Sequence, residues 1–591
     1  MSSTQKMLLA ARYAANHADW ASAENWLRQI LDIHPSSPDV LDEMADALYY
    51  QGRLNDAEIY YRVAISDSPS DLDLRLGLAR LYLRLEYDQQ ALDTITYVLS
   101  HSPRHESALM LICDCLRRLG RIDEAHARAK QLILYYGHKP KYYFYLAGIL
   151  RQTMEYEHLE KLLPGDDVQF SLSERRLRGR QMPSFLADAL DDAGKKRLQS
   201  IATTTHPRNV ASIAPKSGKK RYHVGFVCQE LRDHPVGHYF LPLLRAYAAT
   251  YMPDLRIHVY NAGDDMPHDR TYREIKALIG PHFRSIKNTP MDLVLETIRS
   301  DEIDVLFDLG GHSPRAATWL FEAHLAAVQV MWLGWGHTMG ESAIDYLLVD
   351  KYCVPTDMRY IAEKPAIIDA PYMILPQLPT INEQSIVPLE RNGYVTFGQP
   401  NRFDKWTAQS MARDAKIMNL VPGSRLFVFH PDAACDAAQK NIRKIFAAHG
   451  VDSTRIEFLA NTPQSYGDCM GEIDMVLDPI AVSGGATALD VLAHGVPLLT
   501  QAGDQLFQRF SYGFLQYAGL GELCAQNTDD FIARAVSLAN VPEKLAALRG
   551  GYVRQKIAAS PLLDLPAYGA AWNIFIPQLL DRHSQKCAVR A

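Results

Sequence analysis

A period of 34 residues in the first 137 residues constrains the fold of this chain more than any other feature. The period is carried by two series of residues, which are Pro35, Pro69 and Pro103, and Ala23, Ala57, Ala91 and Ala125. Apolar residues recur at helical spacing between these markers, for example at Trp26, Leu27, Ile30 and Leu31. Each period therefore predicts two helices, which the small alanine allows to approach closely and the proline separates from the next pair. We expect about four pairs over residues 4–137 and a degenerate fifth pair over 142–163.

This period resembles that of the tetratricopeptide repeat, whose length is about 34 residues. One such helix pair cannot bury its own apolar face, so the pairs gain a core by stacking. Residues 1–163 are therefore expected to form an α-solenoid, and by analogy with other solenoids its groove is expected to bind a protein or peptide. Residues 164–221 are polar and partly basic, and we expect them to form a transition helix and a linker.

The overall charge of the chain argues against nucleic acid as its partner. The net charge at pH 7 is −6, so no basic excess is available to contact phosphates. No apolar run approaches the roughly 20 residues that span a bilayer, and the first residues lack the pattern of a secretory signal. The eight cysteines are scattered without a CxxC pair, which is typical of a reduced, cytoplasmic protein without a zinc module.

From residue 222 onward, short β-rich apolar stretches alternate with helical ones. The stretches are HVGFVC, LRIHVYNAG, DVLFDLGG, VQVMWLGW and DYLLVD, followed after a break by YVTFG, RLFVFHP, RIEFLA, DMVLD and VPLLT. This alternation predicts two parallel sheets of five strands, each covered by helices on both faces. We expect two Rossmann-like lobes, 222–385 and 386–591, with a ligand in the cleft at the carboxyl ends of their strands.

The second lobe contains the clearest candidate for an anion site. Ser483, Gly484, Gly485, Ala486 and Thr487 lie between a predicted strand and a helix that starts at about residue 486. Small residues allow the backbone to approach a ligand, and a helix start offers unpaired amides that suit a pyrophosphate. The alternative is a purely structural turn in which Ser483 caps the helix.

Two histidines in the stretch DHPVGHYF stand four residues apart after the first strand of the first lobe. On one helix, His234 and His238 would be spaced for a metal, but Pro235 disfavours helical backbone at His234 and favours a helix start directly after it. We therefore expect no metal here. We interpret His238 as a structural histidine. His234, in contrast, is expected in a loop at the end of a strand, where an imidazole suits proton transfer.

Four further stretches follow in a characteristic order, namely DLGGHSPRA (308–316), VQVMWLGWGHTMG (328–340), GYVTFGQPNRFDK (393–405) and LDPIAVSGGATALDVLAHGVPLLTQAG (477–503). Together with the repeats and the His-Pro element, they resemble motifs of the O-linked N-acetylglucosamine transferases, a family that includes the plant SPINDLY proteins and bacterial homologues. The resemblance covers residues 222 to about 560 and implies a GT-B glycosyltransferase that needs no metal or other cofactor. It also implies a nucleotide sugar as donor and a protein as acceptor.

The resemblance implies specific roles for several residues. His234 corresponds to a proposed catalytic base or acceptor-positioning group, and Glu230 to a proton-accepting or orienting partner. Lys405 is expected beside the donor diphosphate, where it would stabilise the leaving phosphate, and Asp490 beside the ribose. The remaining residues of the implied donor site and cleft are Gly484, Gly485, Ala486, Thr487, Arg402, Tyr466, Arg509, Leu333, Gly334, His238 and His312.

The sequence departs from the family where the base and the sugar are read. Gly485-Ala486-Thr487 stands where relatives have His-Thr-Thr, Arg402 stands where they have glutamine, and Tyr466 aligns with a histidine. UDP-N-acetylglucosamine is the default donor, with GDP-fucose, another UDP-hexose or a CMP-linked nonulosonic acid as alternatives. Flagellin is one candidate acceptor. Two further hypotheses stay open: glycosylation of Asn, and an inactive binding scaffold.

Overall fold

The computed structural model describes residues 2–16, 19–51, 53–163, 186–188, 191–202, 220–313, 316–340, 343–381, 387–460, 462 and 465–590. The chain forms two compact units, Met1–Pro164 and Gly165–Ala591, which are described separately below. Most of the predicted transition segment 164–221 lies outside the described residues. Its described part contains the helix α12 (Asp192–Ala202), which belongs to the second unit.

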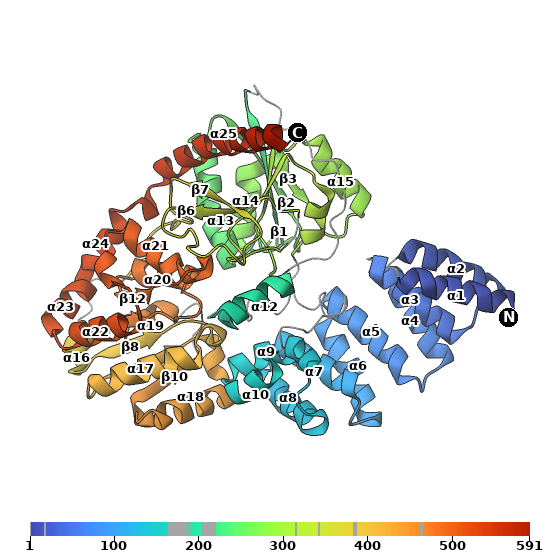
Figure 1. Ribbon diagram of the computed structural model, residues 1–591, viewed down its shortest axis with the longest axis horizontal. Helices are drawn as coiled ribbons and strands as arrows, with labels where there is room; N and C mark the ends of the chain where they lie inside the picture. The colour runs from blue at the N-terminus through green and yellow to red at the C-terminus, as the bar shows by residue number, and fades with distance from the viewer. Residues whose placement is uncertain are drawn as a thin grey trace. The chain divides into compact units, whose positions relative to one another are not determined.

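The first unit consists of five helix pairs (Figure 1). The pairs are α1 (Ser3–Asn16) with α2 (Trp20–Ile33), α3 (Pro38–Gln51) with α4 (Leu54–Asp67), α5 (Leu72–Leu85) with α6 (Asp88–His101), α7 (Glu106–Arg118) with α8 (Ile122–Tyr136), and α9 (Tyr143–Gln152) with α10 (Tyr156–Leu162). The second helix of each pair begins 34 residues after that of the previous pair. The four marker alanines, Ala23, Ala57, Ala91 and Ala125, are at most 1% exposed, because they lie where the helices approach most closely. The predicted solenoid of helical repeats is confirmed.

The first lobe of the second unit contains a seven-stranded sheet in which every strand is parallel to its neighbours. Its strands are β1 (Tyr222–Cys228), β2 (Leu255–Asn261), β3 (Phe283–Ser285), β4 (Val305–Asp308), β5 (Val328–Met331), β6 (Tyr346–Asp350) and β7 (Lys364–Ile368). They follow the order β3-β2-β1-β4-β5-β6-β7. The helices α13 (Pro235–Ala248), α14 (Arg270–Ile279) and α15 (Met291–Ser300) connect the first four strands.

The second lobe contains a six-stranded parallel sheet of order β10-β9-β8-β11-β12-β13. Its strands are β8 (Thr396–Gln399), β9 (Arg425–Phe429), β10 (Ile456–Leu459), β11 (Met475–Leu477), β12 (Leu498–Gln501) and β13 (Cys524–Ala525). Its helices are α16 (Pro388–Asn392), α17 (Ala408–Leu420), α18 (Asp436–Ala448), α19 (Tyr466–Gly471), α20 (Ala486–Ala493), α21 (Phe510–Tyr517), α22 (Thr528–Ala539), α23 (Pro542–Ala547) and α24 (Val553–Ala558). Both sheets have the doubly wound order of Rossmann-like folds, which confirms the predicted fold class.

Two sequence-based expectations about these lobes were wrong. Five strands were predicted in each sheet, whereas β3 and β7 extend the first sheet and β13 extends the second. The last helix, α25 (Leu565–Arg590), packs against the first lobe rather than the second. There, the Trp572 ring contacts the rings of Phe226, Phe307 and Trp332 at tilted angles. Burying this indole against the first sheet requires the chain to cross back, so residues 386–591 do not form a single lobe.

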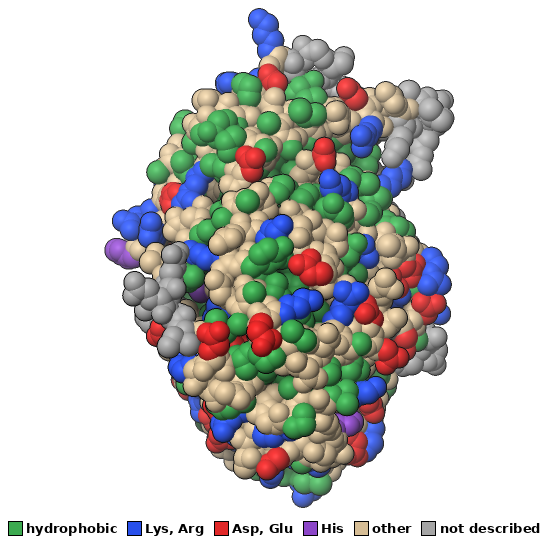
Figure 2. Space-filling view, turned by 90° about the vertical axis from the view of Figure 1, so that its left-hand side faces the viewer, with side chains coloured by type: hydrophobic (Ala, Val, Ile, Leu, Met, Phe, Trp, Pro, Cys, Tyr) green, Lys and Arg blue, Asp and Glu red, His purple; other side chains and the backbone are tan. Residues whose placement is uncertain are grey.

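The charged side chains on the surface are mixed in sign (Figure 2), as expected from the small net charge of the sequence. On the face that Figure 2 shows, Lys and Arg side chains are interspersed with Asp and Glu side chains. Within the part of the chain that the structure describes, no helix combines the length and the apolar character that crossing a bilayer requires.

Candidate active site

Lys405 lies at the carboxyl edge of the second sheet, in the short turn Phe403–Lys405 that follows β8. Its Nζ donates hydrogen bonds to the backbone carbonyls of Ser483 and Gly484, both at 3.2 Å. Burial and the charge of Arg402 together lower the pKa of this lysine to about 8, and the carboxylates of Asp404 and Asp478 oppose the shift. The ammonium is thus mostly protonated near pH 7 and is held against the loop that leads into α20.

Asp478, a residue that the sequence analysis did not single out, holds this loop in place. Asp478 is fully buried directly after β11. One carboxylate oxygen accepts from the Gly484 amide at 2.9 Å and the other from the Thr500 hydroxyl at 2.7 Å. A buried carboxylate needs such partners to offset its desolvation, and here the partners set the position of the loop.

Gly485, rather than Ser483, is the N-cap of α20. The hydroxyl of Ser483 donates to the carbonyl of Phe507 at 2.8 Å, so the structural alternative in which Ser483 caps the helix is wrong. Gly485 has φ +55° and ψ −121°, a region that side chains rarely enter. Within the described residues, the amides of Gly485 and Ala486 have no protein acceptor. The start of α20 therefore offers two free N–H groups, of which that of Gly485 points opposite to the Gly484 carbonyl that Lys405 contacts, because the peptide bond is trans.

Asp490 lies one turn into α20 and marks the side of the site away from Lys405. One of its carboxylate oxygens contacts the hydroxyl of Tyr239 at 3.1 Å. The rings of Tyr466 and His494 meet edge to face near it, with centroids 6.1 Å apart. Burial raises the pKa of Asp490 to about 6, and the hydrogen bond from Tyr239 and the charge of His238 oppose this rise.

A cavity of about 250 Å³ lies between α13 of the first lobe and α20 of the second. Residues of three segments line it, namely Pro235, His238, Tyr239, Leu375, Pro376, Gln377, Pro379, Ala486, Asp490, Ala493 and His494. Predicted residues from both lobes thus meet in one cavity.

His234 occupies the turn between β1 and α13, as the following proline predicted. It is the N-cap of α13, with extended backbone (φ −154°, ψ 149°), and its Nδ1 accepts from the Val236 amide at 3.2 Å. Because that nitrogen is an acceptor, the proton of the neutral ring is on Nε2. Burial lowers the pKa of His234, the charge of Glu230 opposes this shift, and Arg232 and Arg402 strengthen it. The imidazole is accordingly neutral near pH 7.

The two neighbours of His234 that were predicted from sequence have other partners. Glu230 is 9% exposed and forms an ion pair with Arg232 at 2.7 Å. His238 is on the exposed side of α13 and approaches the carboxylate of Asp233 at 2.8 Å. No group of three or more His, Cys, Asp or Glu side chains among the described residues is arranged to hold a metal ion.

The loop after β5 is held in a strained form. Leu333 has φ +80° although it is not glycine, and its amide donates to the hydroxyl of Tyr372 at 2.7 Å. Gly334 leaves no room for a side chain, since a Cβ would lie 2.1 Å from the carbonyl oxygen of Leu309. His312 is buried and its Nε2 contacts the carbonyl of Met339 at 3.1 Å. The structure thus places His312 beneath the cleft as a support of this loop.

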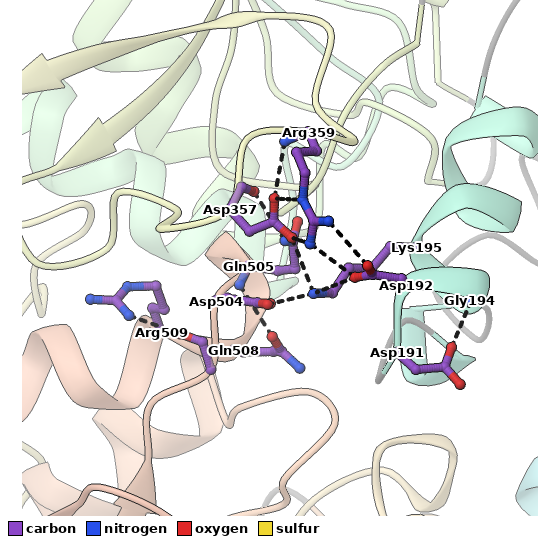
Figure 3. A network of polar contacts seen from close by, with 11 residues as sticks. Asp191, Asp192, Gly194, Lys195, Asp357, Arg359, Asp504, Gln505, Gln508 and Arg509 are labelled. Atoms are coloured by element: carbon purple, nitrogen blue, oxygen red, sulfur yellow. Dashed lines mark hydrogen bonds and ion pairs between the residues drawn. The ribbon is translucent and has the colours of Figure 1, made fainter.

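Arg509 lies where the two lobes join. Its guanidinium donates to the carbonyls of Tyr352 at 3.1 Å and Gly503 at 2.8 Å. In Figure 3 its guanidinium points away from a neighbouring group of charges around Lys195. The guanidinium of Arg509 is thus engaged by carbonyls of both lobes, while the segment that carries it contacts the glycine loop through Phe507 and Ser511.

That neighbouring group ties α12 to both lobes. Lys195 is 5% exposed and forms ion pairs with Asp357 of the first lobe at 3.3 Å and with Asp504 of the second (Figure 3). Arg359 adds pairs with Asp192 at 3.0 Å and with Asp357 at 2.9 Å. Sequence reasoning missed these residues, because only the fold brings three distant segments together.

Comparisons with known proteins agree with this architecture. The family Glycosyl transferase family 41 matches residues 194–392 and 375–572. SPINDLY of Petunia hybrida, described as a probable UDP-N-acetylglucosamine–peptide N-acetylglucosaminyltransferase, is 28% identical over 357 residues, which are 59% of this chain and 37% of that protein. SEC of Arabidopsis thaliana, with the same description, is 23% identical over 389 residues, which are 63% of this chain and 39% of that protein. The chain thus spans well under half the length of these relatives.

Among solved structures, a mutant of the O-GlcNAc transferase of Thermobaculum terrenum superposes with a TM-score of 0.59 at 21% identity. The superposition covers 100% of this chain and 98% of that chain. At this level of identity the likeness concerns the fold, which includes the repeats as well as both lobes.

Proposed function

The chain belongs to glycosyl transferase family 41, and we propose that it transfers a sugar from a nucleotide donor to a Ser or Thr hydroxyl of a protein. The default donor is UDP-N-acetylglucosamine, the donor in the names of the SPINDLY and SEC relatives. The observation that carries the proposal is the Lys405 ammonium fixed beside the glycine loop and the start of α20. A cation and free helix amides at the carboxyl edge of a sheet suit a diphosphate.

In the proposed reaction, the acceptor oxygen bonds to the anomeric carbon of the sugar while the bond from that carbon to the diphosphate breaks. The electron pair of the broken bond stays on the diphosphate, so negative charge grows there. Lys405 and the free amide of Ala486 at the start of α20 stabilise that charge. These groups are already fixed by Asp478 and by the loop carbonyls, so little reorganisation is needed during the reaction.

The acceptor hydroxyl is proposed to lie against His234. Because Nδ1 of His234 caps α13, its Nε2–H holds the acceptor oxygen as a hydrogen-bond donor. The hydroxyl proton then passes to Glu230, whose charge acts on His234 and whose Oε2 is held by Arg232. Asp490 contacts the ribose of the donor, and Tyr466 lies on the side of the base.

The repeats of the first unit are proposed to capture the acceptor protein in the cytoplasm, with flagellin as the first acceptor to test. Helix pairs stacked in this way present an extended surface, which is how solenoids bind peptides. The proposal needs no metal.

Thermal unfolding in the presence of UDP, GDP or CMP tests the donor site. A nucleotide at about 100 times its dissociation constant stabilises the protein by about 2.7 kcal/mol. We expect a rise in Tm with UDP, and its loss in Lys405→Ala. The matched control is Lys416→Ala on α17, whose side chain is 60% exposed.

The other outcomes separate the alternatives. A rise in Tm with GDP or CMP alone would move the donor to GDP-fucose or to a CMP-linked nonulosonic acid. Mass spectrometry of the modified acceptor separates Ser or Thr from Asn. Unchanged melting with all three nucleotides, together with no sugar transfer to any acceptor, would leave the binding scaffold as the function.

A further inference from the structure

Tyr239 connects the two lobes at the candidate ribose site. It lies on α13, one turn after His234, and its side chain is buried with 4% exposure. Its hydroxyl contacts Oδ1 of Asp490 at 3.1 Å and the backbone carbonyl of Ala486 at 3.3 Å. Both acceptors belong to α20, in the other lobe. One phenol of the first lobe therefore touches the start of the helix that carries the donor site.

A phenol has one proton to donate, so its two acceptors compete for it. The carboxylate is the stronger acceptor because hydrogen bonds to charged groups are shorter and stronger than neutral ones. The contact therefore orients Oδ1 of Asp490 toward the first lobe and leaves Oδ2 for a ligand. Asp490 and Tyr239 both line the cavity of about 250 Å³ between the lobes, so a ligand in that cavity meets a carboxylate whose direction is set from the opposite lobe.

The other groups around the Asp490 carboxylate do not replace its hydrogen bond with Tyr239. His238, also on α13, favours the ionised carboxylate, whereas burial opposes it and raises the pKa of Asp490 to about 6. Tyr466 on α19 is neutral near pH 7, because burial raises its pKa well above the usual value. On α20 itself, Nδ1 of His494 contacts the backbone carbonyl of Asp490 at 2.7 Å rather than the carboxylate. Tyr239 is thus the direct hydrogen-bond donor to the carboxylate among the contacts of the described residues.

We propose that Tyr239 is a positioning residue for the nucleotide donor: from the first lobe it orients the Asp490 carboxylate of the second lobe toward the ribose. Tight nucleotide binding then requires the two lobes to be together, which couples occupancy of the donor site to closure of the cleft. This inference rests on the proposed function, because it assigns the ribose to Asp490.

The test is Tyr239→Phe, which removes the hydroxyl and keeps the ring. The dissociation constant of UDP, or of whichever of UDP, GDP and CMP the wild type binds, is measured by calorimetry from pH 5.5 to pH 8. We expect binding to weaken about tenfold at pH 7, since a hydrogen bond to a charged group is lost. In a transfer assay KM for the donor should rise more than kcat falls.

The pH profile distinguishes positioning from simple packing. In the wild type, nucleotide binding should weaken as the pH falls through about 6, where Asp490 takes up a proton. Without the Tyr239 hydroxyl the pKa of Asp490 rises, so the weakening should begin at a higher pH. In Asp490→Asn the contribution of Asp490 to the pH profile should be absent, so that adding Tyr239→Phe to this variant should not shift the profile, whatever the phosphate and Lys405 contribute.

Tyr260→Phe is the matched control. Tyr260 donates to the buried carboxylate of Asp301 at 2.8 Å within the first lobe, and neither residue lines the cavity. Loss of the Tyr260 hydroxyl should lower Tm about as much as Tyr239→Phe does, and it should leave the nucleotide affinity and the pH profile of binding unchanged.

Two results would overturn the inference. Unchanged affinity and an unchanged pH profile in Tyr239→Phe would reduce Tyr239 to packing, and tighter binding would make its hydroxyl an obstacle to the ribose. Failure of the proposed function would look different, since the wild type would then bind none of the three nucleotides, or Asp490→Asn would bind them as the wild type does.

Discussion

The two lobes share one strand order but fix their cleft loops in different ways. In the second lobe the strained position before α20 is a glycine, Gly485, and the loop is held by a buried carboxylate and a lysine. In the first lobe the strained position is a leucine, Leu333, which the hydroxyl of Tyr372 holds. The cleft loop of the second lobe thus presents bare backbone next to Lys405, whereas the cleft loop of the first lobe keeps a side chain at its strained position. This difference matches a diphosphate on one side and a protein hydroxyl on the other.

The same contrast appears in two His-Pro turns, each of which follows a strand. His234 and His430 have nearly equal backbone angles, and each accepts from the second following amide through Nδ1, at 3.2 Å and 3.1 Å. His430 also approaches the carboxylate of Asp432 at 3.2 Å. The capping role is therefore common to both turns, and any role in catalysis must come from the surroundings of His234, where Glu230 and, from the other lobe, Arg402 act on its pKa.

The largest expected effect is that of Lys405→Ala. Removing one fixed group that stabilises developing charge costs about 10²- to 10³-fold in turnover. We expect a loss of this size in kcat for sugar transfer, with the repeats still folded by circular dichroism. Lys416→Ala on the same lobe should keep wild-type turnover. If Lys405→Ala kept the wild-type kcat, Lys405 would not belong to the active site, and the proposed contrast between the two lobes would fail.

The two His-Pro turns can be separated by substitution. His234→Ala and His430→Ala should each lower stability by about 1 kcal/mol, because each loses a helix cap. Only His234→Ala should also lower kcat, by about 10²-fold, the range for a group that assists proton transfer. His234→Asn should restore the cap and the stability but not the turnover. Equal losses of turnover in both alanine variants would mean that the cap alone is responsible.

The fold was largely predictable because its signals repeat. Each marker alanine of the 34-residue period lies at a helix contact, so the period had a direct physical cause. The three strands that were missed carry little signal. β3 and β13 have three and two residues, too short for a pattern, and β7 contains Pro365, which disfavours the interpretation of its five residues as a strand. The return of α25 to the first lobe depends on Trp572 finding a ring cluster that is formed by residues more than 200 positions earlier.

Parts of the candidate site could be predicted from the sequence only where a single segment contains the residues involved. The glycine loop and the His-Pro turn are local, and the structure shows both at the edges of their sheets. Asp478 and Tyr239 were missed because their roles come from contacts with other segments, and the Tyr239–Asp490 pair spans 251 positions. Arg509 was placed in the donor site by resemblance alone, and its carbonyl partners at the lobe junction have no signature in sequence.

The glycine loop should respond strongly to a small side chain. Gly485→Ala places a Cβ at φ +55°, ψ −121°, which costs about 1–3 kcal/mol if the backbone stays in place. We expect a lower Tm and weaker nucleotide binding, because relieving the strain would turn the free amides away from the ligand. A variant with wild-type Tm and wild-type affinity would show that the loop readily adopts another form.

The leucine loop should respond least of all to a substitution at its strained position. Leu333→Gly removes a side chain at φ +80°, where glycine is unstrained. Relief of the strain, about 1 kcal/mol, is offset by the greater freedom of glycine in the unfolded chain and by lost contacts of a half-buried side chain. We therefore expect the free energy of unfolding in denaturant to change by less than about 1 kcal/mol. Tyr372→Phe, which removes the hydroxyl that holds the Leu333 amide, should destabilise the protein less in the wild-type background than in Leu333→Gly, since only the leucine loop recovers strain energy when it is released. Equal effects in the two backgrounds would mean that Tyr372 stabilises the loop without opposing any strain at Leu333.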